Sequence, residues 1–151
     1  MKNFFCTLFI VIITISSYSQ NNTNFDEKLA KELGADDYGM KTYIFCILKT
    51  GKNTTSSDLD KQKLFEGHMQ NINKLAKEKK LIVAGPFMKN ERNYRGIFIF
   101  NCSTIEEAQE LVNSDPAVKE NLLEAELTPL YCSAALMKTN EIHNTISKIK
   151  L

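Results

Sequence analysis

One histidine stands where an apolar residue is expected. The segment 64–75, LFEGHMQNINKL, has the apolar spacing of an amphipathic helix, and His68 falls within its apolar stripe. Imidazole is the side chain that most often transfers protons near neutral pH. A buried imidazole also needs a hydrogen-bond partner on at least one nitrogen. The segment therefore indicates either a histidine satisfied within the core, which is the more frequent case, or a proton-transfer group.

Few other residues could join His68 in a site. His143 is the only other histidine, and its spacing from His68 is not that of metal ligands, so no metal is expected. No Ser or Cys lies in a nucleophile motif, and no phosphate loop or nicotinamide fingerprint is present, so no cofactor is expected. Asp115 differs from the other carboxylates because it stands directly before Pro116 in NSDPAV. Its ordinary role there is to cap the short helix that Pro116 begins.

The remaining sequence predicts the elements that must position these residues. Strand-like runs rich in β-branched and aromatic residues alternate with amphipathic segments that carry capping residues. The predicted order is β-α-β-β-α-β, which is that of a ferredoxin-like α+β fold. The expected strands cover 41–50, 81–86, 95–102 and 127–137; the expected helices begin at Ser57 or Asp58, at Ser103 or Thr104, and within 114–123.

The first and third expected strands are apolar on both faces. In the first strand Tyr43, Phe45 and Ile47 alternate with residues that are equally apolar. Two helices can cover only one face of a four-stranded sheet, and a half-covered sheet would show polar alternation instead. We therefore expect a second copy of the chain to cover the other face and form a homodimer.

Residues 1–19 have the pattern of a secretory signal peptide. Lys2 provides the positive start, residues 4–15 are apolar, and small residues precede an expected cleavage between Ser19 and Gln20. The apolar run is too short to span a bilayer comfortably, and an uncleaved anchor is the alternative. We therefore expect a secreted or periplasmic protein with no stable membrane association after cleavage.

The rest of the chain divides into three parts, namely a polar extension at 20–40, a domain at 41–137 and a tail at 138–151. The formal net charge is +1, and removal of the leader takes away Lys2 and leaves a neutral chain. A neutral chain without a basic stripe is a poor candidate for nucleic-acid binding. The cysteines of the domain, Cys46, Cys102 and Cys132, have neither zinc nor redox spacing and are expected to be small buried hydrophobes.

Three segments of the chain form one pattern: LFEGHMQNINKLAKEKKLIVAGPF, RGIFIFNCSTIEEAQELVNSDPAVKENLL and ELTPLY. Together they resemble the YCII (YciI-like) family over about residues 41–137. The resemblance implies a dimeric α+β barrel built from ferredoxin-like subunits. It also implies a site in which the helical histidine and the aspartate before proline come together, here His68 and Asp115. The leader, the extension and the tail lie outside the family's core.

The site implied by the resemblance would lie between the first helix of the domain and the sheet. Gly85, Pro86 and Phe87 could shape the rim of a substrate pocket there, or they could form only a turn. A carboxylate on one ring nitrogen of His68 would fix the tautomer and raise the basicity of the other nitrogen.

Two functions of different class fit this sequence. The first is a cofactor-free acid–base enzyme that uses His68 and Asp115 for isomerisation, elimination or lactone chemistry on a small cyclic molecule. The second is a non-catalytic dimer, binding a small ligand or serving as a structural module, in which the pair is only a packing tie. A pocket that reaches His68 would favour the enzyme, and a sealed imidazole would favour the tie.

Overall fold

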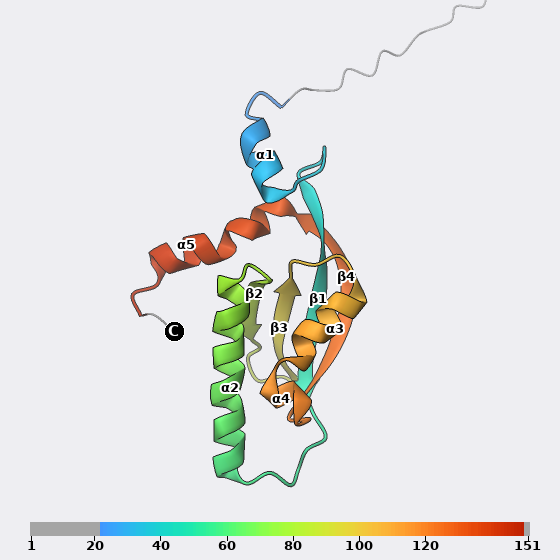
Figure 1. The fold of residues 1–151 in the computed structure, drawn as a ribbon, viewed down its shortest axis with the longest axis vertical. Coiled ribbons are helices and arrows are strands. Elements are labelled where there is room, and N and C mark those ends of the chain that lie inside the picture. The colour runs from blue at the N-terminus through green and yellow to red at the C-terminus, as the bar shows by residue number, and fades with distance from the viewer. Residues whose placement is uncertain (1–21, 150–151) are drawn as a thin grey trace, which may run out of the picture.

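A computed structural model describes residues 22–149, so the expected leader at 1–19 lies outside the described residues. The described chain forms a four-stranded antiparallel sheet with helices packed on one face, and the predicted ferredoxin-like α+β fold is confirmed (Figure 1). The elements in chain order are α1 (Glu27–Leu33), β1 (Met40–Thr50), α2 (Asp58–Lys77), β2 (Leu81–Pro86), β3 (Tyr94–Phe100), α3 (Ile105–Asn113), α4 (Pro116–Lys119), β4 (Leu123–Ser133), the 3₁₀ helix η1 (Ala134–Lys138) and α5 (Thr139–Ile146).

Strand β1 organises the sheet, whose order is β2-β3-β1-β4. It pairs with β4 along its whole length, from Met40 opposite Ser133 to Thr50 opposite Leu123. On its other edge it pairs with β3, where Ile44 lies opposite Phe100. Because β1 and β3 are both central, their side chains are buried most deeply.

The main core lies between the sheet and helices α2, α3 and α4. Alternate residues of β1 and β3 point into it, and the apolar stripes of the helices close it from the other side. This two-layer packing holds α2 and α4 over the same face of the sheet. Its buried members include Ile44, Cys46, Leu48, Leu75, Leu81, Phe98, Phe100, Ala108, Val112, Ala117 and Leu123.

Strand β4 differs from its predicted bounds, 127–137. It begins at Leu123 and ends at Ser133, and residues 134–138 form η1 instead. The segment LEAEL alternates apolar and acidic residues, so in the sheet Leu123 packs into the main core while Glu124 and Glu126 stay exposed. Pairing along the whole of β1 therefore overrides the helical propensity of this segment.

The second face of the sheet is partly covered by the chain itself, which the sequence argument did not foresee. Tyr43, Ile82 and Ile99 are buried there, and Leu136 and Met137 of η1 pack against them. The C-terminal segment thus covers the end of this face near the start of β1 (Figure 1). The predicted dimer through this face stays a prediction.

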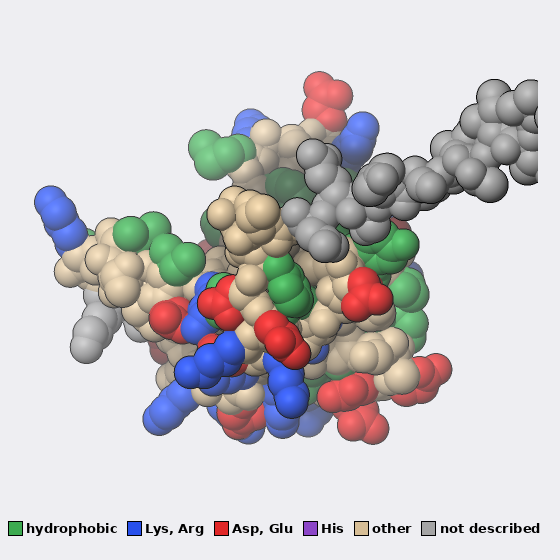
Figure 2. All heavy atoms as spheres, turned by 90° about the horizontal axis from the view of Figure 1, so that it is seen from above, with side chains coloured by type: hydrophobic (Ala, Val, Ile, Leu, Met, Phe, Trp, Pro, Cys, Tyr) green, Lys and Arg blue, Asp and Glu red, His purple; other side chains and the backbone are tan. Residues whose placement is uncertain are grey.

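Helix α5 extends beyond the body of the fold. Its residues Ile142 and Ile146 are 56% and 73% exposed. From above, hydrophobic side chains show on this arm, while acidic and basic side chains both lie on the surface of the body (Figure 2). No helix within residues 22–149 is both long and apolar enough to cross a membrane.

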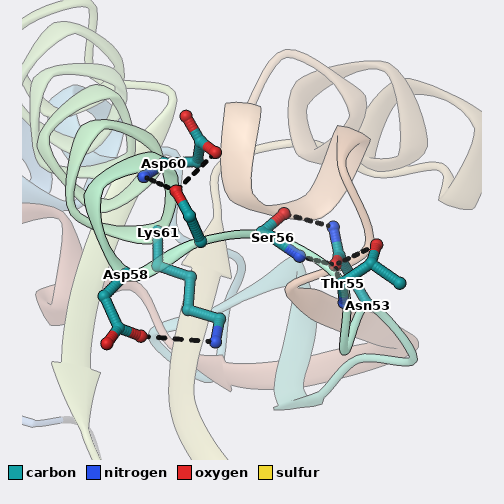
Figure 3. A network of polar contacts seen from close by, with 7 residues as sticks. Asn53, Thr55, Ser56, Asp58, Asp60 and Lys61 are labelled. Carbon is teal, nitrogen blue, oxygen red and sulfur yellow. Dashed lines mark hydrogen bonds and ion pairs between the residues drawn. The ribbon is translucent and has the colours of Figure 1, made fainter.

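The loop from β1 to α2 is fastened to the turn between α4 and β4. The side chain of Asn53 donates to Ser56 Oγ at 2.9 Å and to the carbonyl of Glu120 at 2.8 Å. Its carbonyl oxygen accepts from the backbone N–H of Ser56 at 3.1 Å (Figure 3). Gly51 donates its backbone N–H to Leu122 O at 2.9 Å in the same contact. The loop therefore fixes where α2 starts relative to α4.

Replacing Gly51 by Ala should disrupt this junction. A Cβ at position 51 would lie 2.1 Å from the backbone oxygen of Asn121, which cannot move as a side-chain end can. We expect the free energy of unfolding, measured with urea, to fall by about 2 kcal/mol. Gly85→Ala is the control, because no atom lies within 4 Å of its added Cβ. Equal stability of the two variants would contradict the predicted clash.

The cysteines should differ in reactivity. Cys46 and Cys102 are buried, and desolvation raises the pKa of their thiols to about 12 and about 11, whereas Cys132 is half-buried and free. Since the thiolate is the reactive form, iodoacetamide at pH 8 should modify Cys132 first. Peptide mass spectrometry would measure this, and rapid native labelling of Cys46 would contradict it.

The same burial makes stability depend on pH. Above pH 9 the thiols of the unfolded chain ionise, while Cys46, whose pKa is about 12, stays protonated in the folded state. The unfolded state then binds fewer protons than the folded state, so the free energy of unfolding should fall as the pH rises from 9 toward 12. Urea titrations of wild type and Cys46→Ala would separate this contribution from other ionisations.

Candidate functional site

Helix α2 positions His68. It begins after Ser57, whose hydroxyl accepts from the backbone N–H of Asp60 at 3.2 Å (Figure 3). Acidic residues occupy its first turn, and Lys74 and Lys77 occupy its last turn, as the helix dipole favours. His68 lies about three turns after the start of α2, on the side that faces the sheet, where Phe98 lies beneath its ring.

Helix α4 and its capping residue position Asp115. The helix has four residues, Pro116 stands at its start, and Asp115 is its N-cap. Asp115 Oδ1 accepts from the backbone N–H of Ala117 at 2.9 Å. The cap that the sequence pattern predicts is therefore present, and it holds a carboxyl group with 0% exposure inside the protein.

The structure brings His68 and Asp115 together. His68 Nδ1 lies 2.6 Å from Asp115 Oδ2. Because an ionised carboxylate oxygen only accepts, Nδ1 is the donor in this hydrogen bond. The other carboxyl oxygen is the one that caps α4. Asp115 thus serves both as a helix cap and as the partner of the imidazole, which were separate interpretations of the sequence.

Two aromatic rings fix the plane of the imidazole. Phe98 stacks on it with a centroid separation of 5.8 Å and an interplanar angle of 26°. Phe65 approaches edge-on at 6.0 Å and 86°. Neither was singled out from the sequence as a site residue, although the alternation of β3 places Phe98 on the helix-covered face. Restricted in plane and position, the ring presents Nε2 in one direction.

The imidazole is mostly buried but not sealed. The side chain of His68 is 11% exposed, and Nε2 makes no hydrogen bond to any residue between 22 and 149. A shallow hollow of about 540 Å³ runs beside Phe65 along α2, although His68 itself does not line it. Its lining residues are Gln62, Phe65, Glu66, Met69 and Gln70.

The structure places Gly85, Pro86 and Phe87 at the end of β2. Pro86 pairs with Gly96 of β3, and the ring of Phe87 lies 5.8 Å from that of Tyr94. None of the three lines the hollow beside Phe65. Their part in substrate binding stays a prediction, and what the structure shows them forming is a strand end.

The described residues give no sign of a metal centre. No group of three or more His, Cys, Asp or Glu side chains between residues 22 and 149 is arranged to hold a metal ion. His143 lies on α5, whereas His68 lies on α2. The site brings together one mostly buried imidazole and one buried carboxyl group.

Comparison with known proteins adds a family to this geometry. No curated protein matches the chain. Among solved structures, a 5-chloro-2-hydroxyhydroquinone dehydrochlorinase from Burkholderia phenoliruptrix, in complex with 2,5-dihydroxybenzoquinone, is similar at 17% identity with a TM-score of 0.41. The similarity covers 58% of this chain and 90% of that one. The profile of the YCII-related domain matches residues 43–129, which include His68 and Asp115, and the chain belongs to this family.

Proposed function

We propose that this YCII-related protein is a cofactor-free acid–base enzyme that acts on a small cyclic molecule. His68 Nε2 is the group that takes and returns the proton. Asp115 orients the ring and stabilises the positive charge that the ring gains with the proton. One observation carries the proposal: both oxygens of a fully buried carboxyl group are engaged, one by α4 and one by His68 Nδ1, which leaves Nε2 as the free basic atom.

The proposed chemistry follows from this arrangement. Nε2 removes a proton from an acidic C–H of the substrate, and the positive ring that forms is stabilised by the carboxylate 2.6 Å from Nδ1. The electron pair left on the substrate then either expels a leaving group or shifts within the ring. In the second case Nε2 returns the proton to another carbon. Elimination, isomerisation and lactone opening or closure are the reactions of this type.

Aromatic surroundings support a flat, uncharged substrate. Phe65, whose ring packs edge-on against the imidazole, is 40% exposed, and Met69 on the next turn of α2 is 42% exposed. The hollow that they line contains Glu66 as its one ionisable side chain and no cation. A planar ring could stack there more readily than an anion could bind.

The competing function is a non-catalytic dimer in which the pair ties α2 to α4. The limited exposure of His68 and its absence from the lining of the hollow favour this alternative. In either case His68→Ala should lower the free energy of unfolding by about 1–3 kcal/mol, because Asp115 is left buried with one oxygen unpaired. Turnover separates the two functions, because only the enzyme loses an activity together with the histidine.

The enzyme proposal predicts a specific response to Asp115→Asn and His68→Gln. Small uncharged cyclic enones and lactones would be screened in D₂O by NMR for deuterium incorporation or product formation. His68→Gln should lower the turnover of a substrate by roughly 10²- to 10⁴-fold. Asp115→Asn should also lower turnover, because Asn keeps a helix cap but removes the charge beside Nδ1.

A matched control is available on the same helix. Lys63→Gln changes an exposed side chain of α2 that does not line the hollow, and it should keep turnover within about threefold. Turnover that survives His68→Gln unchanged would show that another group carries the reaction. Thermal unfolding of each variant would confirm that lost activity is not lost folding.

We also propose a homodimer through the second face of the sheet. The centre of this face is half-buried and apolar, with Phe45, Ile47 and Ile97 away from the segment that η1 covers. Beside it, Lys49 forms an ion pair with Glu126. A two-fold axis sets such a face against itself, and a patch that carries both signs of charge can complement its own copy.

The dimer proposal predicts the response to Ile97→Glu. This change places a carboxylate in the centre of the apolar patch and should convert the dimer into a monomer. Light scattering after gel filtration would measure the mass, which for one full chain is 17.2 kDa. Thr42→Glu is the control, since Thr42 is an exposed residue of β1 outside the patch. A wild-type protein of monomeric mass would refute the proposal.

Finally, we propose that the domain works after export. The support is the leader pattern at residues 1–19, with its positive start, apolar run and small residues before Gln20. Mass spectrometry of the protein recovered outside the cytoplasm would give its first residue. An intact Met1 in the exported protein would contradict cleavage.

A further inference from the structure

Helix α2 meets the segment around Asp115 in a regular antiparallel register. His68 contacts Asp115, as described above. One residue earlier on α2, the Cα of Gly67 faces the ring of Pro116. One turn later, Asn71 Oδ1 lies 3.1 Å from the hydroxyl oxygen of Ser114. The contacts thus run forward along α2 and backward along residues 116 to 114. The proposed acid–base pair lies in the middle of them.

Gly67 is a glycine in the interior of helix α2. Glycine is less favourable than alanine in the interior of a helix, so its presence at this position calls for a structural reason. Here the space is taken. A Cβ on residue 67 would lie 3.0 Å from Pro116 Cγ and 3.5 Å from Pro116 Cβ. The first distance is tighter than ordinary carbon–carbon contact, so either the helix or the proline would have to move.

The proline has little freedom to move. Its ring is closed on the backbone at the start of α4, and the neighbouring Asp115 is held by its cap to Ala117 N and by its bond to His68. Any displacement is therefore transmitted to the adjacent pair, because Gly67 and His68 are consecutive on one rigid helix and Asp115 and Pro116 are consecutive on the other segment. A separation of 2.6 Å between Nδ1 and Oδ2 leaves no slack for this displacement.

We propose that Gly67 is a positioning residue for the His68–Asp115 pair: the absence of its side chain lets α2 approach Pro116 closely enough for the short Nδ1–Oδ2 hydrogen bond to form. Its effect on catalysis rests on the proposed function, whereas its effect on the hydrogen bond does not. A side chain at position 67 separates α2 from α4 and weakens that bond, even though it raises the helical propensity of α2.

The test is an NMR measurement of the His68 ring in the full chain. Two-dimensional ¹H–¹⁵N spectra optimised for ring couplings identify which nitrogen carries the proton and detect the Nδ1 proton directly. In wild type we expect a low-field proton on Nδ1. In Gly67→Ala the Nδ1 proton signal should move upfield or be lost by exchange with water.

Rescue distinguishes positioning from general disruption. Pro116→Ala removes Cγ and with it the 3.0 Å contact, while the 3.5 Å contact to Cβ remains ordinary. The double variant Gly67→Ala/Pro116→Ala should therefore regain the wild-type Nδ1 signal, and Pro116→Ala alone should keep it. If Gly67→Ala does not fold, a folded double variant with the wild-type signal supports the proposal equally. A wild-type signal in Gly67→Ala, or a double variant without rescue, overturns it.

Turnover separates this inference from the proposed function. With a substrate in hand, Gly67→Ala should lower kcat by about tenfold or more with little change in KM, and the double variant should recover most of kcat. If the Nδ1 signal responds as expected and turnover does not, the positioning role stands and the acid–base function of His68 falls. If the Nδ1 signal does not respond, the positioning role falls whatever the turnover shows.

Discussion

The structure of the site depends on one constraint, which is that a carboxyl group with no exposure to water must satisfy both of its oxygens. Asp115 meets it by accepting from a backbone N–H of α4 and from an imidazole N–H of α2. Leaving one oxygen of this buried carboxylate unpaired would cost about 1–3 kcal/mol. The two helices therefore cannot shift independently of each other. The ring of His68 cannot turn without leaving the buried carboxylate of Asp115 with an unpaired oxygen.

The surrounding structure serves this constraint at three levels. The sheet supplies a flat aromatic support, since Phe98 stacks beneath the imidazole and Phe100 packs edge-on against Phe98 with a centroid distance of 5.6 Å. The loop around Asn53 fixes the start of α2 against the end of α4. At the contact itself, the backbone of Gly67 packs directly against the ring of Pro116. Each of these contacts restricts the motion of His68 or Asp115, so the hydrogen bond between them costs less conformational entropy.

The sequence predicted the fold well because its strongest signals are local. Alternating and helical periodicity, together with Ser57 and Thr104 as caps, set the order and most bounds of the elements. It failed where distant pairing decides the outcome. The acidic LEAEL segment joins β4 only because β1 offers a partner along its full length, and the cover that η1 gives to the second face depends on tertiary packing. For the site, His68 stood out as a polar residue in an apolar stripe. Its partner could not be chosen without the family resemblance, because a cap and a catalytic carboxylate look identical in NSDPAV.

The position of β1 in the sheet has a consequence for the order in which the chain can fold. The central strand is the first to be synthesised, yet one of its neighbours is β3 and the other is β4, at the far end of the domain. Until β4 emerges, a full edge of β1 has no partner, and the main core lacks Leu123. Folding dominated by contacts between distant segments is slow compared with folding of local hairpins and helices. The nascent domain therefore lacks one edge partner of its central strand and part of its main core until nearly all of it has been made.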